Sequence, residues 1–189
     1  MMNMKIYLLD INTEMTQAWK TLFDGIENIE VVNQPFDGFM KSHLYIDCVV
    51  SPANSFGLMD GGFDLAITEY FGNKLQKRVQ RYIIKHYYGE QPVGTSIAVA
   101  ANENVLLIHT PSMRYPQPII DKTVIYNCMR STLITAMQNN VGWIVIPAFG
   151  GCTGRVSPDV IADMMYRAYV QLLNPPDELN WDYVRTQII

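Results

Sequence analysis

Residues 50–64 read VSPANSFGLMDGGFD and form a short polar loop between two regular elements. The run before it, DCVV at 47–50, is mostly apolar and β-branched, which predicts a buried strand that stops at Ser51. A helical pattern starts at residue 62, directly behind the glycines. The loop therefore joins a strand to a helix, with Asn54 and Asp64 at its two ends, and its glycines let a ligand come close to the backbone.

Strand-like runs alternate with helical patterns along the rest of the chain. Strands are expected at 5–9, 29–32, 47–50, 96–101, 105–109 and 142–148. Helices are expected at 13–25, 62–71, 74–88, 121–138 and from Pro158 to about 173, the last one with Ser157 as its N-cap. The runs 96–101 and 105–109 predict a hairpin. The alternation predicts a mixed, mostly parallel sheet with helices on both faces, an α/β fold of three layers.

In such sheets, ligands bind beyond the carboxyl ends of the strands. Two glycine loops are expected at that edge, one at 61–62 and one at 150–154, and each directly precedes a helix. Free amides at a helix N-terminus attract anions, so two such loops could hold a diphosphate, with Arg155 as a nearby cation. No Walker A pattern G-x-x-x-x-G-K-[ST] occurs. The structural alternative is that these glycines only serve tight turns.

The composition is that of a globular protein, because 49% of the 189 residues are hydrophobic and 17% are charged. We expect a single domain over 1–189, in which the C-terminal segment 174–189 packs back on the body. No apolar stretch approaches the ~20 residues that span a bilayer, and the N-terminus lacks a signal-peptide pattern. We therefore expect a cytoplasmic protein without a membrane partner.

The three cysteines and three histidines are scattered and form no C-x-x-C pair. This usage indicates a reducing compartment and predicts neither a disulfide framework nor a metal site. The net charge of −4 disfavours nucleic acid as a partner. One basic helix, at 74–88, is the exception, and its apolar residues recur at helical spacing. We interpret its cations as a solvated outer face, and the alternative is salt-dependent binding of nucleic acid through that face.

Three acids fit either a structural or a functional role. Asp64 lies in the first turn of its helix, where it would stabilise the helix dipole or, beside an anion site, orient or activate a water. Asp60 fits a solvated loop acid. Asp10, at a strand end, could cap the next helix or accept a hydrogen bond from an exocyclic amine. Taken singly, each residue favours the structural role.

Four segments in the same order resemble macro domains. IDCVVSPANSFGLMDGGFDLAI, at 46–67, resembles their V-D-A-I-V-N-A-A-N segment with the glycine run and V-D-x-A-I that follow it. VLLIHTPSMRYP, at 105–116, resembles V-I-H-T-V-G-P, and LLDIN, at 8–12, is similar to a G-D-I stretch. IVIPAFGGCTGRVSP, at 144–158, resembles the second phosphate loop. The resemblance spans about residues 4–173 and is that of a divergent microbial or phage-like branch.

The resemblance implies an ADP-ribose site and assigns a role to each matching residue. Asp10 would hydrogen-bond the adenine amine, with the Ile11 amide close by, and Asn54 would contact the distal ribose. Asp64 matches the aspartate that hydrolytic members place at the same interval from the asparagine. The implied ligand-binding residues are Asp10, Ile11, Ala53, Asn54, Gly61, Gly62, Phe63, Gly150, Gly151, Cys152, Thr153, Gly154 and Arg155, and the implied catalytic residues are Asn54 and Asp64. Ser51 and Pro52 stand where the pattern has Asn-Ala, and Met59 and Asp60 interrupt the glycine run.

The implied function is binding of ADP-ribose and hydrolysis of mono-ADP-ribosyl esters on acidic side chains, by a water that Asp64 positions. This mechanism needs no metal and no cofactor. The implied partner is ADP-ribose itself or an ADP-ribosylated protein or metabolite. Two alternatives to this implied function remain open. One is a binding module for ADP-ribose or a related nucleotide without turnover, and the other is a phosphatase for ADP-ribose 1''-phosphate.

Overall fold

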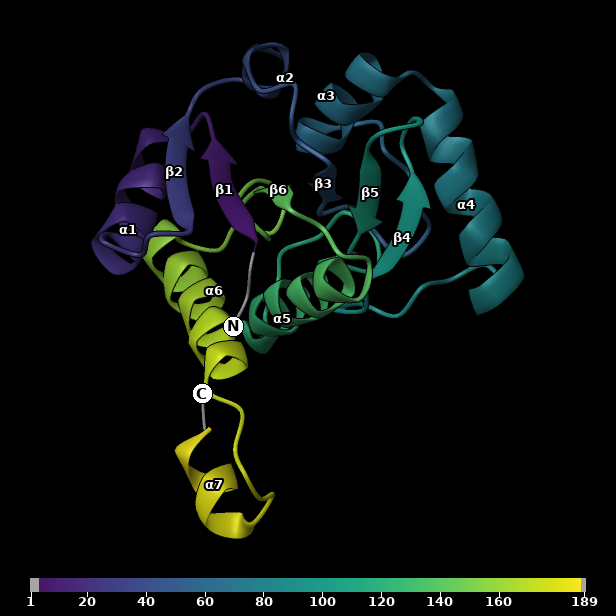
Figure 1. The fold of residues 1–189 in the computed structure, drawn as a ribbon. Helices are drawn as coiled ribbons and strands as arrows, with labels where there is room; N and C mark the ends of the chain where they lie inside the picture. The colour runs from purple at the N-terminus through teal and green to yellow at the C-terminus, as the bar shows by residue number, and fades with distance from the viewer. Residues whose placement is uncertain (1–3, 188–189) are drawn as a thin grey trace.

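The computed structural model describes residues 4–187. Within them, six strands form one sheet in the order β2-β1-β6-β3-β5-β4 (Figure 1). The strands are β1 (Lys5–Asp10), β2 (Ile29–Asn33), β3 (Cys48–Ser51), β4 (Ile97–Ala100), β5 (Leu106–His109) and β6 (Trp143–Ile146). The helices are α1 (Thr13–Phe23), α2 (Phe36–Ser42), α3 (Gly62–Phe71), α4 (Lys74–Tyr87), α5 (Thr123–Gln138), α6 (Pro158–Leu173) and α7 (Trp181–Thr186). Neighbouring strands are parallel, except that β4 runs antiparallel to β5.

Helices cover both faces of the sheet and enclose two hydrophobic cores. In β1, Ile6 and Leu8 face one core, which the helices α1, α5 and α6 complete. Tyr7 and Leu9 face the other, which α2, α3 and α4 complete. Side chains of a strand alternate between the two faces, so a strand buried on both sides reads as a continuous apolar run. The three-layer α/β/α architecture and the mixed, mostly parallel sheet are therefore confirmed.

The expected strands and the five expected helices are present, with ends that differ by one or a few residues. The hairpin is confirmed as β4 and β5, which pair from Ile97 with His109 to Ala100 with Leu106. Two helices were not expected. The first, α2, buries Phe36, Phe39 and Met40 against the sheet. The second, α7, lies in the C-terminal segment. None of the helices in residues 4–187 is long and apolar enough to cross a membrane.

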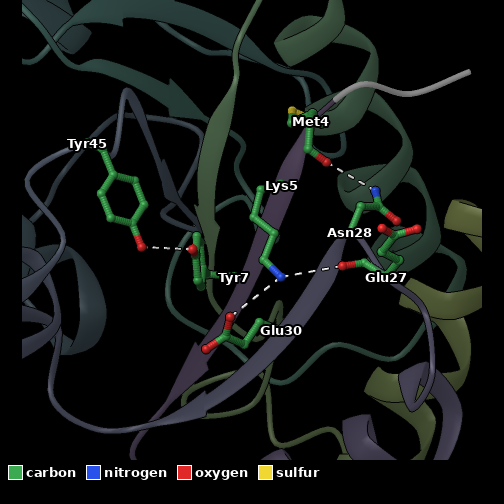
Figure 2. Close-up of polar contacts among 7 residues, drawn as sticks. All are labelled: Met4, Lys5, Tyr7, Glu27, Asn28, Glu30 and Tyr45. Carbon is green, nitrogen blue, oxygen red and sulfur yellow. Dashed lines mark hydrogen bonds and ion pairs between the residues drawn. The ribbon is translucent and has the colours of Figure 1, made fainter.

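Polar contacts at the amino-terminal half of β1 join it to neighbouring segments (Figure 2). The Lys5 Nζ atom lies 3.5 Å from a Glu30 carboxylate oxygen on β2. The Tyr7 hydroxyl lies 2.9 Å from the Tyr45 hydroxyl, in the segment that leads to β3. Burial and this contact raise the pKa of Tyr7. These residues hold the end of the sheet opposite to the glycine loops, so their role is structural.

The C-terminal helix α7 lies beyond α6, away from the sheet (Figure 1). It has no buried residue, and Trp181 is 74% exposed. One contact joins it to α6, where Gln171 Nε2 donates to the Tyr183 hydroxyl at 3.0 Å. Residues 188 and 189 lie outside the described residues, so the packing of 174–189 on the body stays a prediction for the whole segment.

Candidate functional site

The sheet order places three of the predicted site segments side by side. The strands β1, β6 and β3 are consecutive neighbours and parallel, so their carboxyl ends lie at the same edge. Asp10 ends β1, the loop at 147–157 follows β6, and the loop at 52–61 follows β3. Both glycine loops and Asp10 therefore leave the same edge of the sheet, which is where ligands bind in open α/β folds.

Asp64 is a buried acid whose carboxylate is held from one side. Its side chain lies in the first turn of α3, and the residue is only 9% exposed. The Ser51 hydroxyl, on the fully buried last residue of β3, donates to Asp64 Oδ1 at 2.6 Å. The second oxygen, Oδ2, accepts no hydrogen bond from the described residues, and it is not fully buried. The carboxylate thus has one anchored oxygen and one that water can reach.

The environment raises the pKa of the Asp64 carboxyl from 3.8 to about 7. Burial is the largest cause, because it disfavours the charged form. The hydrogen bond from Ser51 opposes this rise, and the negative charge of Asp60 adds to it. A carboxyl with a pKa near neutrality can take up a proton from water and release it again at physiological pH.

The first glycine loop is open in front of α3. Gly61 is the N-cap of the helix and has no side chain that could bond the amides of the first turn, so these remain available to a ligand. Gly62 has a left-handed backbone with φ of +55°, which favours glycine. Added Cβ atoms at either position would meet no atom within 4 Å. Both glycines therefore border open space and not packed atoms of the fold.

Asn54 uses its side chain to build the loop. Its Oδ1 accepts hydrogen bonds from the amides of Phe56, at 3.1 Å, and Leu58, at 3.3 Å. Its Nδ2 donates to the Leu58 carbonyl at 2.9 Å, and the residue is 7% exposed. The amide therefore shapes the turn after β3, and one N–H of Nδ2 is left for a ligand.

The segment after β3 stays paired with the segment after β5. The Thr110 amide donates to the Ser51 carbonyl at 2.9 Å, and the Ser112 amide donates to the Ala53 carbonyl at 3.1 Å. The Ser55 amide follows with bonds of 3.1 Å to the carbonyls of both Met113 and Arg114. Ala53 is buried in this extension of the sheet. This pairing fixes the backbone from which the glycine loop departs.

Met59 and Asp60, which interrupt the glycine run, point in different directions. Met59 is 1% exposed and belongs to the core that α2, α3 and α4 cover. Asp60 is exposed. The Met59 amide donates to Gln76 Oε1 at 2.8 Å, and its carbonyl lies 3.1 Å from the Thr68 hydroxyl. The backbone of Met59 therefore anchors the loop to α3 and α4.

Replacing Thr68 with valine should loosen this loop. The hydroxyl donates to carbonyls of Met59 and Leu65, and valine keeps the shape of the side chain without the donor. We expect a loss of about 1 kcal/mol in the free energy of unfolding, measured with urea. The matched change Thr21→Val, at an exposed site on α1, should have less than half this effect. Equal losses at the two sites would contradict the anchoring role of Thr68.

The second glycine loop closes tightly on itself. The Val156 amide donates to the Gly150 carbonyl at 3.2 Å, and the Arg155 amide donates to the Cys152 carbonyl at 3.2 Å. Arg155 has a left-handed backbone, with φ of 54°, that a residue with a Cβ seldom adopts. The exposed residues of this loop are Gly151, Cys152, Thr153 and Arg155, while Gly154 is buried beneath them. The loop thus presents its backbone, the side chains of Cys152 and Thr153 and the cationic side chain of Arg155 to solvent.

Asp10 and Ile11 lie at the end of β1. Asp10 Oδ1 accepts a hydrogen bond from the Asn12 amide at 2.8 Å, and burial raises the pKa of the carboxyl despite this bond. Asn12, rather than Asp10, caps α1, because its side chain accepts from the amides of Glu14 and Met15. Ile11 is 71% exposed. The Asp10 carboxylate is therefore free to accept a further hydrogen bond.

Phe63 is half-buried, and its ring lies 5.2 Å from the ring of Phe36 on α2. The side chain thus packs on the core beside the first glycine loop. The predicted residues on the β3–α3 connection and the first turn of α3 are Ala53, Asn54, Gly61, Gly62, Phe63 and Asp64, and the others lie on the two neighbouring segments. Ser51 was missed as a site residue. Its position at the end of a buried strand was the available signal, but its link to Asp64 depends on how α3 returns over the sheet.

The basic helix α4 behaves as an amphipathic surface helix. Leu75, Val79 and Ile83 are buried, as expected for its inner face. The exposed cations border a shallow groove of about 530 Å³, which contains none of the predicted site residues.

Within residues 4–187, no group of three or more His, Cys, Asp or Glu side chains is arranged to hold a metal ion.

Comparisons with known proteins agree with this fold. The macro domain family model matches residues 50–165, more than half of the chain. An uncharacterised protein of Aquifex aeolicus is 29% identical over 122 residues, 63% of this chain and 70% of that protein. Two structures of the Oceanobacillus iheyensis macrodomain, one with ADP and one of a variant with ADPR, are each 23% identical to this chain and have TM-scores of 0.61. Each match covers 70% of this chain, and it covers 72% of the chain with ADP and 73% of the variant with ADPR.

The macrodomain of Mycobacterium tuberculosis DarG has the same fold with a TM-score of 0.58. It is 16% identical, and the match covers 67% of this chain and 83% of that one. The family match covers the β3–α3 loop and the second glycine loop, two of the three segments that form the candidate site, while the end of β1 lies outside the matched residues. The chain belongs to the macro domain family.

Proposed function

We propose that this macro domain binds ADP-ribose at the edge formed by the carboxyl ends of β1, β6 and β3. Three observations support this ligand. Two glycine loops, each before a helix N-terminus, offer amides to a diphosphate from neighbouring strands. A free acceptor on Asp10 suits an exocyclic amine. Structures with the same fold carry ADP and ADPR.

In this arrangement, the adenine lies beside Asp10 and the exposed Ile11. The diphosphate lies between the loop at 61–62 and the loop at 150–155, where Arg155 adds a positive charge. The distal ribose then lies above the first turn of α3, next to Asp64. The amides of both loops are fixed by the fold before the ligand binds, so binding requires little rearrangement.

We further propose that the domain hydrolyses mono-ADP-ribosyl esters on acidic side chains. The Asp64 carboxylate supports this activity most directly, because one oxygen is anchored and the other is reachable by water. The carboxylate accepts a proton from a water as the water oxygen attacks the anomeric carbon of the distal ribose. The bond between that carbon and the ester oxygen breaks, and the electron pair leaves with the carboxylate of the modified side chain. A carboxylate is a good leaving group, so the reaction needs no strong general acid.

One observation favours the alternative of a binding module without turnover. The Asn54 side chain makes three hydrogen bonds within its own loop. Only one N–H remains to orient the distal ribose, so substrate orientation would rest mainly on the backbone of the glycine loops. A module that only reads ADP-ribose would tolerate this arrangement, since binding does not require the anomeric carbon to face a water.

To test this proposal, the protein is incubated with a target that is mono-ADP-ribosylated on Glu or Asp, and the free ADP-ribose is measured. We expect release by the native protein and a rate at least about 100-fold lower for Asp64→Ala. The dissociation constant for ADP-ribose, from calorimetry, should change less than about fivefold in this variant. Binding by both proteins with release by neither would establish the binding module. Phosphate release from ADP-ribose 1''-phosphate, lost in the same variant, would instead establish the phosphatase.

A further inference from the structure

We propose that Ser51 is a positioning residue for this reaction, and that its hydroxyl sets which oxygen of Asp64 faces the attacking water. This inference rests on the proposed hydrolysis and assigns a role to a residue that was not among the predicted site residues. Ser51 stands where the pattern of the resembling motif has asparagine, so the motif as it is written does not supply this hydroxyl.

The sheet fixes the backbone of the donor. Ser51 is the last residue of β3, is 0% exposed, and pairs in register with His109 of β5. Its carbonyl accepts a hydrogen bond from the Thr110 amide at 2.9 Å, which fixes the backbone beyond the strand end. The serine side chain is short, so its hydroxyl has little freedom to leave Asp64. The distance of 2.6 Å between Oγ and Oδ1 is typical of a hydrogen bond to a charged oxygen.

The acceptor, by contrast, comes from another element. Asp64 lies on α3, and no other described side chain donates to its carboxylate. Without Ser51 the carboxylate could rotate about its terminal torsion, which has a broad energy minimum. With Ser51, Oδ1 points to the strand end and Oδ2 stays accessible at the start of the helix. The hydrogen bond therefore converts a free carboxylate into one with a defined reacting oxygen.

The same hydrogen bond favours the ionised form of the base. Burial and the charge of Asp60 both favour the protonated form of Asp64, and the Ser51 hydroxyl favours the charged form. Among the described residues, Asp60 is the charged side chain that acts on this carboxyl, while the packed elements β3, α2 and α4 contribute none. A base must be ionised to accept a proton, so the loss of Ser51 should suppress the reaction most strongly at low pH.

Two substitutions should move the pH profile in opposite directions. In the native protein kcat should rise with pH through about 7, as Asp64 loses its proton. We call this rising part of the pH profile its acidic limb. In Ser51→Ala this limb should move to higher pH, and kcat at pH 6.5 should fall about tenfold while KM changes less than twofold. In Asp60→Asn, a change of an exposed residue, the limb should move to lower pH. Ser51→Thr keeps the hydroxyl and should restore most of the rate at pH 6.5.

A titration of the Asp64 carboxyl by carbon NMR, without substrate, separates failure of this inference from failure of the proposed hydrolysis. An inactive native protein would reject hydrolysis, and the NMR midpoints would still decide whether Ser51 holds Asp64. A higher midpoint in Ser51→Ala and a lower one in Asp60→Asn support the inference. An unchanged midpoint and an unchanged limb in Ser51→Ala overturn it. If Ser51→Ala fails to fold, Ser51→Cys, a much weaker donor, takes its place with the same two outcomes.

Discussion

Replacing Asp64 with asparagine should abolish hydrolysis and, above neutral pH, make the fold more stable. Asparagine has almost the same shape, and its Oδ1 can still accept the hydrogen bond from Ser51. It cannot accept a proton from water, so the rate should fall about 10³-fold, within the range of a lost general base.

The stability gain follows from the pKa of the buried carboxyl. The pKa is 3.8 in the unfolded chain and about 7 in the fold, so the folded state binds the proton more tightly. The stability that this proton provides is fully present below about pH 4 and is lost as the pH rises through about 7. The loss amounts to about 2–4 kcal/mol at pH 8, and asparagine does not suffer it. The difference between the two proteins should shrink towards zero near pH 4.

Urea unfolding of both proteins at pH 5 and pH 8 measures this difference. The control is Asp24→Asn, because Asp24 is an exposed acid just after α1. It should change the free energy of unfolding by less than about 0.5 kcal/mol at both pH values. If Asp64→Asn is no more stable than the native protein at pH 8, the fold favours the charged carboxylate. The base would then lack the raised pKa on which the proposed mechanism depends.

The part of the site that sequence reasoning reached is the part that local chemistry determines. A β-branched run, a polar loop with glycines and an acid placed where a helix dipole favours it gave the β3–loop–α3 unit, with Asp64 in the first turn. The alternation of strands and helices gave the layers. Each of these features depends on residues close together in the chain, so a single sequence contains the necessary information.

The contacts that the sequence did not reveal depend on tertiary geometry. Ser51 and Asp64 are 13 residues apart, and their hydrogen bond forms only once α3 packs back over β3. Similarly, Met59 interrupts the glycine run in the sequence and is a core residue in space. Asn54 was predicted from the resemblance to bind the ligand, yet its side chain makes three hydrogen bonds within its own loop. Side-chain direction in a loop follows from backbone angles that composition does not specify.

The missed helix α2 illustrates the same limit. Its N-cap position is Pro35, which provides no side-chain hydrogen bond, and Gly38 lies within the helix. Both features weaken an isolated helix. The burial of Phe36 and Phe39 against the sheet compensates for them, and burial of one such ring contributes about 2 kcal/mol. A helix that depends on its packing partners carries little local signal.

Replacing Gly154 with alanine should disrupt the second glycine loop and with it the binding of ADP-ribose. An added Cβ would lie 2.5 Å from the Gly150 carbonyl oxygen and 2.7 Å from the Gly150 Cα atom. These are backbone atoms of the same loop, so no side chain can move aside. The Gly154 carbonyl also accepts a hydrogen bond from the Ile119 amide at 2.9 Å, which restrains the loop from the other side. The loop must open, which displaces the backbone that we propose as the diphosphate site.

We expect the dissociation constant for ADP-ribose to rise about 100-fold in Gly154→Ala, equivalent to about 2.7 kcal/mol, and the free energy of unfolding to fall by about 1–3 kcal/mol. The matched control is Gly151→Ala in the same loop, where an added Cβ meets its nearest atoms at 3.5 Å, an ordinary contact. Its stability should stay within about 0.5 kcal/mol of the native protein, and its affinity should fall less than tenfold. Calorimetry and urea unfolding of the three proteins test both values. Equal affinities for Gly154→Ala and the native protein would place the diphosphate elsewhere, because a loop opened by this contact could not keep its amides directed at one anion.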